Sequence, residues 1–331
     1  MRLLLAASLL TLFACSSSNE SGGLIPSPSG GSSSSPTESS ASPTDDEEGT
    51  TPTDTGDPMP STDAGPTSDA STKAPKNYAL GKSAGCSKTT GATGLQTRTK
   101  TIGGKTRDYL RFIPAGYKPG TPVSVVFGFH GSGGTAAKAR SMFDLEGQAG
   151  AKAIFIYPQG LPDPAFGGDN RWDPNAGSDD YTFIDELLAE VEASHCVARD
   201  RVFAVGFSNG ARMTSMVGCN RGDKFRAIAP VAPGGNQTTL PLSPTACVGE
   251  VAIWEGVGTE DPDHIPGAEL VRDYYRTSNG CTATKKATTP AGCNAYDGCR
   301  TEVPSVYCTY PGGHAWPSIG TNAVWSFFSK F

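Results

Sequence analysis

A series of short apolar runs, alternating with helical stretches from residue 123 onward, constrains the fold of this chain most. The run Val123–Phe129 is apolar except at Ser124 and Gly128, and comparable runs follow it. Apolar runs without polar alternation are typical of strands buried on both faces, as in a parallel sheet. Because strands that alternate with helices form crossover units, the pattern predicts an α/β fold with a doubly wound, mostly parallel sheet.

The predicted elements can be placed along the chain. Strands are expected at residues 96–101, 107–113, 123–129, 153–157, 202–205, 227–231, 251–257 and 306–310. One helical stretch is expected to include Met142 and Leu145, and further helices are expected at residues 181–194, 211–217, 267–278 and 323–331. The first two strands flank Gly103 and Gly104 and are expected to form a hairpin. Active sites of doubly wound sheets lie beyond the carboxyl ends of the strands.

Residues 1–15 have the pattern of an export signal. Arg2 precedes the apolar run 3–13, which is too short for a permanent membrane helix, and Ala14 precedes Cys15. Residues 12–15, Leu-Phe-Ala-Cys, resemble the lipobox of bacterial lipoproteins, whose cysteine is acylated and becomes the mature N-terminus. We therefore expect a lipid on Cys15, with an ordinary secretory signal as the alternative. In either case the protein is exported, anchored by lipid at the cell surface or outer membrane, or secreted.

Residues 16–75 are predicted to be a disordered tether. They are almost entirely Ser, Thr, Pro, Gly, Asp and Glu, and so cannot bury enough apolar surface to fold. A random coil of about 60 residues has an r.m.s. reach of roughly 45 Å. The tether holds ten acidic residues against Lys73, so the folded part, residues 76–331, is nearly neutral although the whole chain carries a net charge of −6. We therefore do not expect the clustered basic face that nucleic-acid binding requires, and we expect no nucleic-acid partner.

The cysteine count fits an oxidising compartment. The chain has nine cysteines, and a lipid on Cys15 leaves eight, which is enough for four disulfides. A structural zinc ion is the alternative, but the sequence holds no Cys-x-x-Cys pair and its four histidines are not at ligand spacing. We expect neither a metal nor a cofactor.

Residues 206–210, Gly-Phe-Ser-Asn-Gly, match the pattern Gly-x-Ser-x-Gly. Glycine and serine are common in this chain, so the pattern alone is weak evidence. Its position is stronger evidence, because it falls between a predicted strand and a predicted helix, where a nucleophile turn lies. We predict Ser208 as a nucleophile, the alternative being a glycine-rich turn without chemistry.

A serine hydroxyl needs a base, and the fold orders its groups as Ser, then acid, then His. His264 and His314 follow Ser208 in the sequence. His314 is the predicted base because it follows the last predicted strand and two glycines, whereas His264 lies in a polar loop. Asp261 is the predicted acid, since it follows the strand at 251–257. Asp263 stays open as the alternative acid.

Four further residues complete the predicted site. The turn at 130–134 follows a strand end, and we assign the backbone N–H groups of Ser132 and Asn209 to an oxyanion hole. His130 in that turn is expected to be structural. Trp172 and Trp316 could form apolar walls for an aromatic or sugar group, with core packing as an equal alternative.

Residues 83–331 resemble the secreted feruloyl esterase and polyhydroxybutyrate depolymerase group, allied to carbohydrate esterase family one. The resemblance rests on Ser-Ala-Gly-Cys at 83–86, the segment 196–210 and Gly-Gly-His-Ala-Trp-Pro at 312–317. It implies an α/β-hydrolase fold and a serine esterase with Ser208, Asp261 and His314 as its triad. Members of the group commonly have two residues between the acid and Val-Pro, whereas three residues, 262–264, follow Asp261 here. This departure is why Asp263 remains an alternative.

The resemblance implies substrates among feruloyl esters of plant cell-wall polysaccharide. Acetylated xylan and polyhydroxybutyrate-type polyesters are alternatives within the same group. A non-catalytic, polysaccharide-binding surface lipoprotein is a hypothesis from another class, motivated by the anchor and tether. We expect a monomer whose only contact with a membrane is through the lipid.

Overall fold

The computed structural model describes residues 80–331, except residue 90 and residues 235–241 and 243–246. The predicted signal segment 1–15 with Cys15, the tether 16–75 and the domain start at Lys76 lie outside the described residues. Among the helices that are described, none has the length and apolar character needed to cross a membrane.

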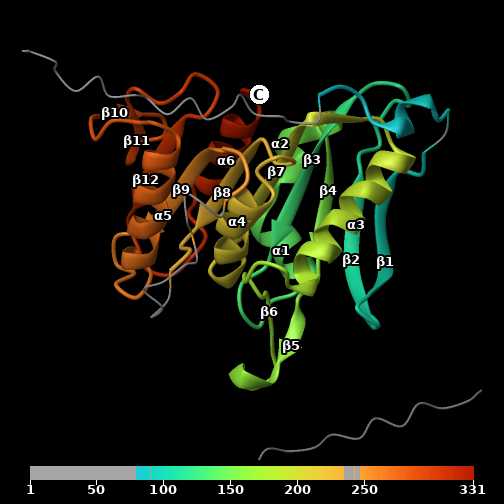
Figure 1. The fold of residues 1–331 in the computed structure, drawn as a ribbon, viewed down its shortest axis with the longest axis horizontal. Coiled ribbons are helices and arrows are strands. Elements are labelled where there is room, and N and C mark those ends of the chain that lie inside the picture. Colours follow the sequence, from blue (N-terminus) through green and yellow to red (C-terminus); the bar gives the residue numbers. More distant parts are fainter. Residues whose placement is uncertain (1–79, 90, 235–241, 243–246) are drawn as a thin grey trace, which may run out of the picture. The chain divides into compact units, whose positions relative to one another are not determined.

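In the described part of the chain, ten strands form one sheet in the order β1-β2-β4-β3-β7-β8-β9-β12-β11-β10 (Figure 1). Neighbours from β4 to β12 pair in parallel, and the strands at both ends pair antiparallel. The strands are β1 Gly94–Ile102, β2 Lys105–Ile113, β3 Val123–Phe129, β4 Ala153–Pro158, β7 Val197–Phe207, β8 Ala227–Val231, β9 Ala252–Gly258, β10 Lys285–Thr288, β11 Cys293–Tyr296 and β12 Ser305–Tyr310. The predicted α/β class and mostly parallel sheet are confirmed.

Helices cover both faces of the sheet and create two cores (Figure 1). One core contains side chains of α3, α4 and α5, and the other contains side chains of α1, α2 and α6. The helices are α1 Ala136–Phe143, α2 Leu145–Ala149, α3 Asp179–Ser194, α4 Asn209–Asn220, α5 Ile265–Ser278 and α6 Gly320–Phe328. In β3, Val125 and Phe127 point into the first core and Val126 into the second. Each such side chain contributes about 1.5–3 kcal/mol when buried. Burial on both faces explains why the central strands are mostly apolar and do not alternate with polar residues.

The structure departs from the predicted elements mainly at the edges of the sheet. β10 and β11 were not predicted, because β10 is exposed and opens with two lysines, so it carries no apolar pattern. A separate ribbon of β5 Leu161–Asp163 and β6 Asp169–Arg171 was also missed, since each strand has three residues. The predicted last helix at 323–331 begins earlier and ends earlier, as α6 Gly320–Phe328.

Four disulfides are present among the described residues, which confirms the predicted number. The pairs are Cys86–Cys196, Cys219–Cys247, Cys281–Cys299 and Cys293–Cys308. The first closes a loop of 110 residues and joins the short 3-10 helix Ala84–Ser87 to the residue before β7. The last joins paired positions of β11 and β12.

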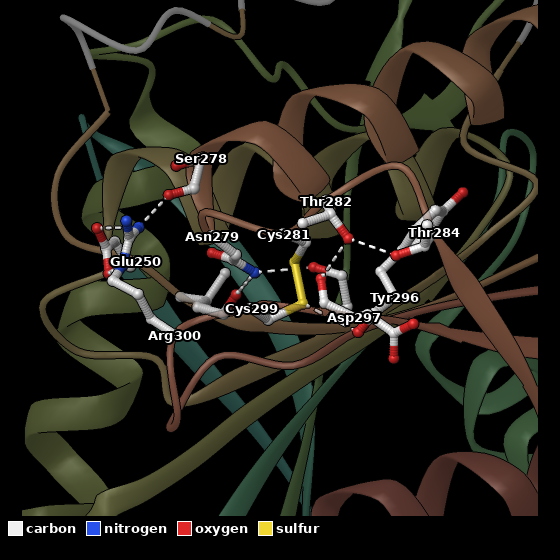
Figure 2. The surroundings of a disulfide bond; sticks show 12 residues. Glu250, Ser278, Asn279, Cys281, Thr282, Thr284, Tyr296, Asp297, Cys299 and Arg300 are labelled. Carbon is white, nitrogen blue, oxygen red and sulfur yellow. Dashed lines mark hydrogen bonds and ion pairs between the residues drawn. A yellow bond between two sulfur atoms is a disulfide. The ribbon is translucent and has the colours of Figure 1, made fainter. Parts of the chain in front are cut away.

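The surroundings of Cys281–Cys299 fix the end of α5 (Figure 2). Asn279, which is fully buried, donates from its amide to Val251 O at 2.9 Å and to Ser305 Oγ at 3.1 Å. Val251 directly precedes β9 and Ser305 begins β12. The end of α5 is therefore tied to the starts of two neighbouring strands whose far ends lead into the predicted site.

The carboxyl group of Glu255 in β9 is buried, and neither of its oxygens has a hydrogen-bond partner among the described residues. Burial raises the pKa of this carboxyl well above its usual value, because desolvation disfavours the charged form, and the nearby Arg272 only partly opposes the shift. The folded protein therefore keeps Glu255 protonated at pH values where the unfolded chain ionises it.

We expect Glu255→Gln to raise the free energy of unfolding at pH 8 by roughly 1–3 kcal/mol and to leave it nearly unchanged at pH 4. Because the folded-state pKa is raised, the wild type loses stability as pH rises above the unfolded pKa, about 4.3. Denaturant unfolding at both pH values tests this, with the exposed Glu302→Gln as control. An equal gain for Glu255→Gln at pH 4 and pH 8 would contradict it.

Candidate active site

Ser208 occupies a tight turn between the end of β7 and the start of α4, as the sequence predicted. Its backbone has φ 57° and ψ −121°, a conformation that a non-glycine residue adopts only under strain. The turn is held by hydrogen bonds on both sides, from Ser208 N–H to Val231 O at 3.0 Å and from Arg212 N–H to Ser208 O at 3.1 Å. The strain is therefore maintained by β8 and by the first turn of α4.

The two glycines of the pattern are required by close backbone contacts. A Cβ atom at Gly206 would lie 2.3 Å from the carbonyl oxygen of Gly210. A Cβ atom at Gly210 would lie 2.1 Å from the carbonyl oxygen of Phe129, at the end of β3. Both distances are far below van der Waals contact, so only glycine allows β3, β7 and α4 to meet this closely.

Asp261 and His314 are in direct contact. His314 Nδ1 lies 2.8 Å from Asp261 Oδ2, and the Asp261 side chain is only 3% exposed. Asp261 follows β9, and His314 follows β12, the parallel neighbour of β9. Asp263, the alternative acid, is exposed and makes no hydrogen bond among the described residues. The geometry thus pairs the base candidate with Asp261.

The loops that carry Asp261 and His314 are joined by their backbones. Glu260 N–H donates to Gly312 O at 2.9 Å, and Thr259 N–H donates to Tyr310 O at 2.9 Å. The Tyr310 hydroxyl donates to Ala315 O at 2.8 Å, on the far side of His314. These bonds continue the parallel pairing of β9 and β12 past the strand ends. The side chains of Asp261 and His314 come together because their loops extend this pairing.

The His314 ring stacks on Phe207, the residue before Ser208, with 4.6 Å between ring centroids. This contact brings the imidazole beside the turn that holds Ser208. Among the described residues no hydrogen bond joins Ser208 Oγ to His314. Catalytic hydrogen bonds are often long or poorly aligned in the absence of substrate. The position of the His314 ring beside the Ser208 turn therefore agrees with proton transfer between the two residues.

Asn209 directly follows Ser208, and Ser132 belongs to a turn that approaches Ser208. Asn209 is the first residue of α4, where a backbone N–H has no partner within the helix. Ser132 belongs to the turn after β3, and a Cβ at neighbouring Gly131 would sit 3.3 Å from Ser208 Cβ. Neither backbone N–H has an acceptor among the described residues. The turn is braced by Arg171, whose Nη1 donates to Ser132 Oγ at 2.7 Å.

His130 is 2% exposed and is held as a neutral ring. Its Nε2 accepts from Gly160 N–H at 2.9 Å, which leaves Nδ1 to donate to Gly131 O at 2.8 Å. Burial lowers the pKa of His130 to about 4. Its ring therefore supports the turn, and its hydrogen bonds leave it no nitrogen to exchange protons with a substrate.

The two predicted aromatic walls have different surroundings. Trp172 is 3% exposed and donates from Nε1 to His130 O at 2.9 Å. Its ring is therefore not a freely exposed platform. It nevertheless lines an open cleft of about 810 Å³, together with Asn209 of α4, Arg171 of β6, and Phe166 in the 3-10 helix between β5 and β6. Trp316 is half-buried against Phe143, with 4.7 Å between ring centroids. Its contacts are those of a packed side chain.

His264 is the residue that the sequence interpretation set aside and the structure brings to the site. Its Nδ1 lies 2.7 Å from Asp261 Oδ1, and its ring stacks on that of His314 with 3.7 Å between centroids. The three-residue spacing from Asp261 just before a helix could have signalled this contact, because one turn returns position i+3 toward position i. Arg171 was also missed, and nothing in its sequence context signals a bond to Ser132.

Asp261, His264 and His314 offer nitrogen and oxygen atoms within 4.8 Å of one another, a set that zinc accepts. Both Nδ1 atoms, however, point at Asp261, and the two imidazole planes differ by only 17°. Lone pairs in nearly parallel rings do not converge on one point, as tetrahedral coordination requires. The three residues therefore fit a hydrogen-bonded cluster better than a metal centre.

Comparison with known proteins places the chain among esterases. It is 29% identical over 246 residues to feruloyl esterase C of Emericella nidulans, and 30% identical over 246 residues to a probable feruloyl esterase C of Aspergillus niger. Each match covers 67% of this chain and 83% of the relative. No family model matches the chain.

Solved structures agree on the fold. An acetyl xylan esterase from Aspergillus awamori superposes with a TM-score of 0.56 at 16% identity, covering 71% of this chain and 99% of that one. A ferulic acid esterase superposes with a TM-score of 0.51 at 15% identity, covering 73% and 99%. Because the relative at 30% identity is matched over most of its length, the chain belongs to the feruloyl esterase family and is a carboxylic ester hydrolase with the α/β-hydrolase fold.

Proposed function

We propose that this protein is an exported serine esterase with Ser208, His314 and Asp261 as its catalytic triad, acting on feruloyl esters of plant cell-wall polysaccharide. The observation that carries the proposal is the 2.8 Å hydrogen bond between His314 and the buried Asp261, beside the strained turn of Ser208. A carboxylate that orients an imidazole next to a strained serine is the arrangement that acyl transfer needs.

The reaction follows from the tautomer of His314. With Nδ1–H donated to Asp261, Nε2 carries the lone pair and removes the proton of Ser208 as its Oγ attacks the ester carbonyl. The backbone N–H groups of Ser132 and Asn209 stabilise the oxyanion that forms. His314 then protonates the leaving alcohol, and water, activated by the same imidazole, hydrolyses the acyl-enzyme and releases the acid.

The cleft beside Asn209 supports a bulky substrate. Its volume of about 810 Å³ is larger than an acetyl group requires and is open to solvent for a polymer. Phe166 stands at its edge, 45% exposed, with the guanidinium of Arg171 3.6 Å from the ring centre. Such a face can stack on the ring of a feruloyl group or a sugar. The relatives are named as feruloyl esterases, which favours the feruloyl group over the acetyl and polyester alternatives.

Export is supported by the four disulfides, because such bonds persist in oxidising compartments. The proposed lipid on Cys15 and the tether at 16–75 would hold the enzyme at a cell surface while leaving it room to reach an insoluble polymer.

Ser208→Ala and Asp261→Asn should both remove most of the activity, while Asp263→Asn should keep it. In enzymes of this type, loss of the carboxylate that fixes the histidine tautomer lowers kcat by about 10⁴-fold, and loss of the nucleophile lowers it by about 10⁶-fold. The matched pair of Asp→Asn variants separates the two acid candidates, and the exposed Ser326→Ala serves as control. Steady-state hydrolysis of an activated ester measures the effect. Activity in Asp261→Asn with loss in Asp263→Asn would reverse the assignment.

4-Nitrophenyl ferulate should be hydrolysed with a higher kcat/KM than 4-nitrophenyl acetate. Both esters share one leaving group, so the difference reports the acyl group alone. Phe166→Ala should raise KM for the ferulate and not for the acetate, because only the larger acyl group reaches the β5–β6 ribbon. A preference for the acetate, or release of hydroxybutyrate from poly-3-hydroxybutyrate with no turnover of the ferulate, would select one of the alternatives.

Cys15→Ser should abolish incorporation of labelled palmitate and shift the full chain from the membrane fraction to the soluble fraction. The reason is that the thiol of Cys15 is the proposed acylation site. The measurement uses the wild type and the variant expressed in a bacterium that lipidates proteins. Ser16→Ala is the control. A wild type that carries no label and is recovered in the medium would instead indicate an ordinary secretory signal.

A further inference from the structure

The carboxylate of Asp261 serves two imidazoles at once. Its Oδ2 lies 2.8 Å from Nδ1 of His314, and its Oδ1 lies 2.7 Å from Nδ1 of His264. The Asp261 side chain is 3% exposed, so these two rings replace the water that would otherwise solvate a charged carboxylate. Each oxygen thus has its own N–H donor.

His264 is held in place independently of His314. Its backbone N–H donates to Asp261 O at 3.0 Å, and its carbonyl accepts from Ala268 N–H at 3.0 Å in the first turn of α5. Gly234 packs against its backbone so closely that a Cβ there would lie 2.4 Å from His264 O. The imidazole is therefore anchored by the helix start, with its side chain 17% exposed.

The hydrogen bonds fix the tautomers of both rings. Because a carboxylate only accepts, each Nδ1 must carry a proton, which leaves each Nε2 with a lone pair when the rings are neutral. The rings are stacked with 3.7 Å between centroids. Two imidazolium ions at this distance would repel strongly.

We propose that His264 is a positioning residue for the triad acid. By donating to Oδ1 it fixes the rotation of the Asp261 carboxylate so that Oδ2 faces His314, and as a neutral ring it leaves the catalytic proton to His314. The inference rests on the triad of the proposed function and adds a fourth side chain to it. It concerns the orientation of Asp261.

His264→Ala should lower kcat about 10- to 100-fold with KM unchanged, because misorientation of the acid acts on the proton-transfer step. His264→Asn should recover most of the loss, since its amide can supply a donor near the position of Nδ1 without titrating. Glu260→Gln, an exposed neighbour in the same loop, is the control. Recovery by Asn distinguishes a hydrogen-bond role from simple packing, and thermal unfolding of each variant shows whether the fold is intact.

His264→Lys should lower kcat further and move the acid limb of the kcat/KM–pH profile to lower pH. A permanent cation beside His314 repels a second positive charge on its ring. Among the described residues, Asp261 and Tyr310 are titratable groups beside the pair. Burial raises the pKa of Tyr310, which keeps its hydroxyl neutral across the measured range.

Wild-type kcat and pH profile in His264→Ala would overturn this inference alone, and so would equal loss in the Asn and Ala variants with their folds intact, or an unmoved acid limb in His264→Lys. A wild type without esterase activity, or full activity in Ser208→Ala, would instead overturn the proposed function, and this inference with it.

Discussion

The hydrogen bond between His314 and the buried carboxylate of Asp261 is the interaction on which the account of this site depends. It joins two loops that are 53 residues apart in the sequence and adjacent only because β9 and β12 pair in parallel. Hydrogen bonds to a charged carboxylate are stronger than neutral ones, and they are costly to leave unmade in a buried position. The bond therefore both orients the imidazole and fixes the two loops to each other.

The site is rigid because it is built at the ends of packed strands. The strained backbone of Ser208 is enforced by hydrogen bonds to β8 and within α4, and the flanking glycines allow β3 and α4 to approach within contact of one another. The disulfide Cys281–Cys299 and the buried Asn279 hold the far end of α5, the helix that starts directly after His264. Strain at Ser208 can persist because the surrounding sheet leaves it no alternative conformation.

The central fold and the placement of Ser208 in a turn between a strand and a helix could be predicted from the sequence, because their signals are local or follow from chain order. Apolar runs located the parallel strands, and the strand–glycine–serine–glycine–helix order located Ser208. Asp261 and Asp263 could not be separated, because their difference is burial, which only the loop conformation decides. The contact of His264 with Asp261 was missed because His264 was treated as a polar loop residue, although its i to i+3 spacing just before a helix could have signalled it. β5, β6, β10 and β11 are too short or too exposed to produce a periodic pattern.

The central claim, that Ser208 is the nucleophile activated by His314, can be tested most directly by mapping a covalent adduct. The folded protein would be treated with a fluorophosphonate, digested, and analysed by mass spectrometry, alongside His314→Asn. We expect a single adduct on the peptide that contains Ser208, formed rapidly in the wild type and very slowly in the variant. An adduct on a different serine, or no adduct from a preparation that hydrolyses esters, would contradict it.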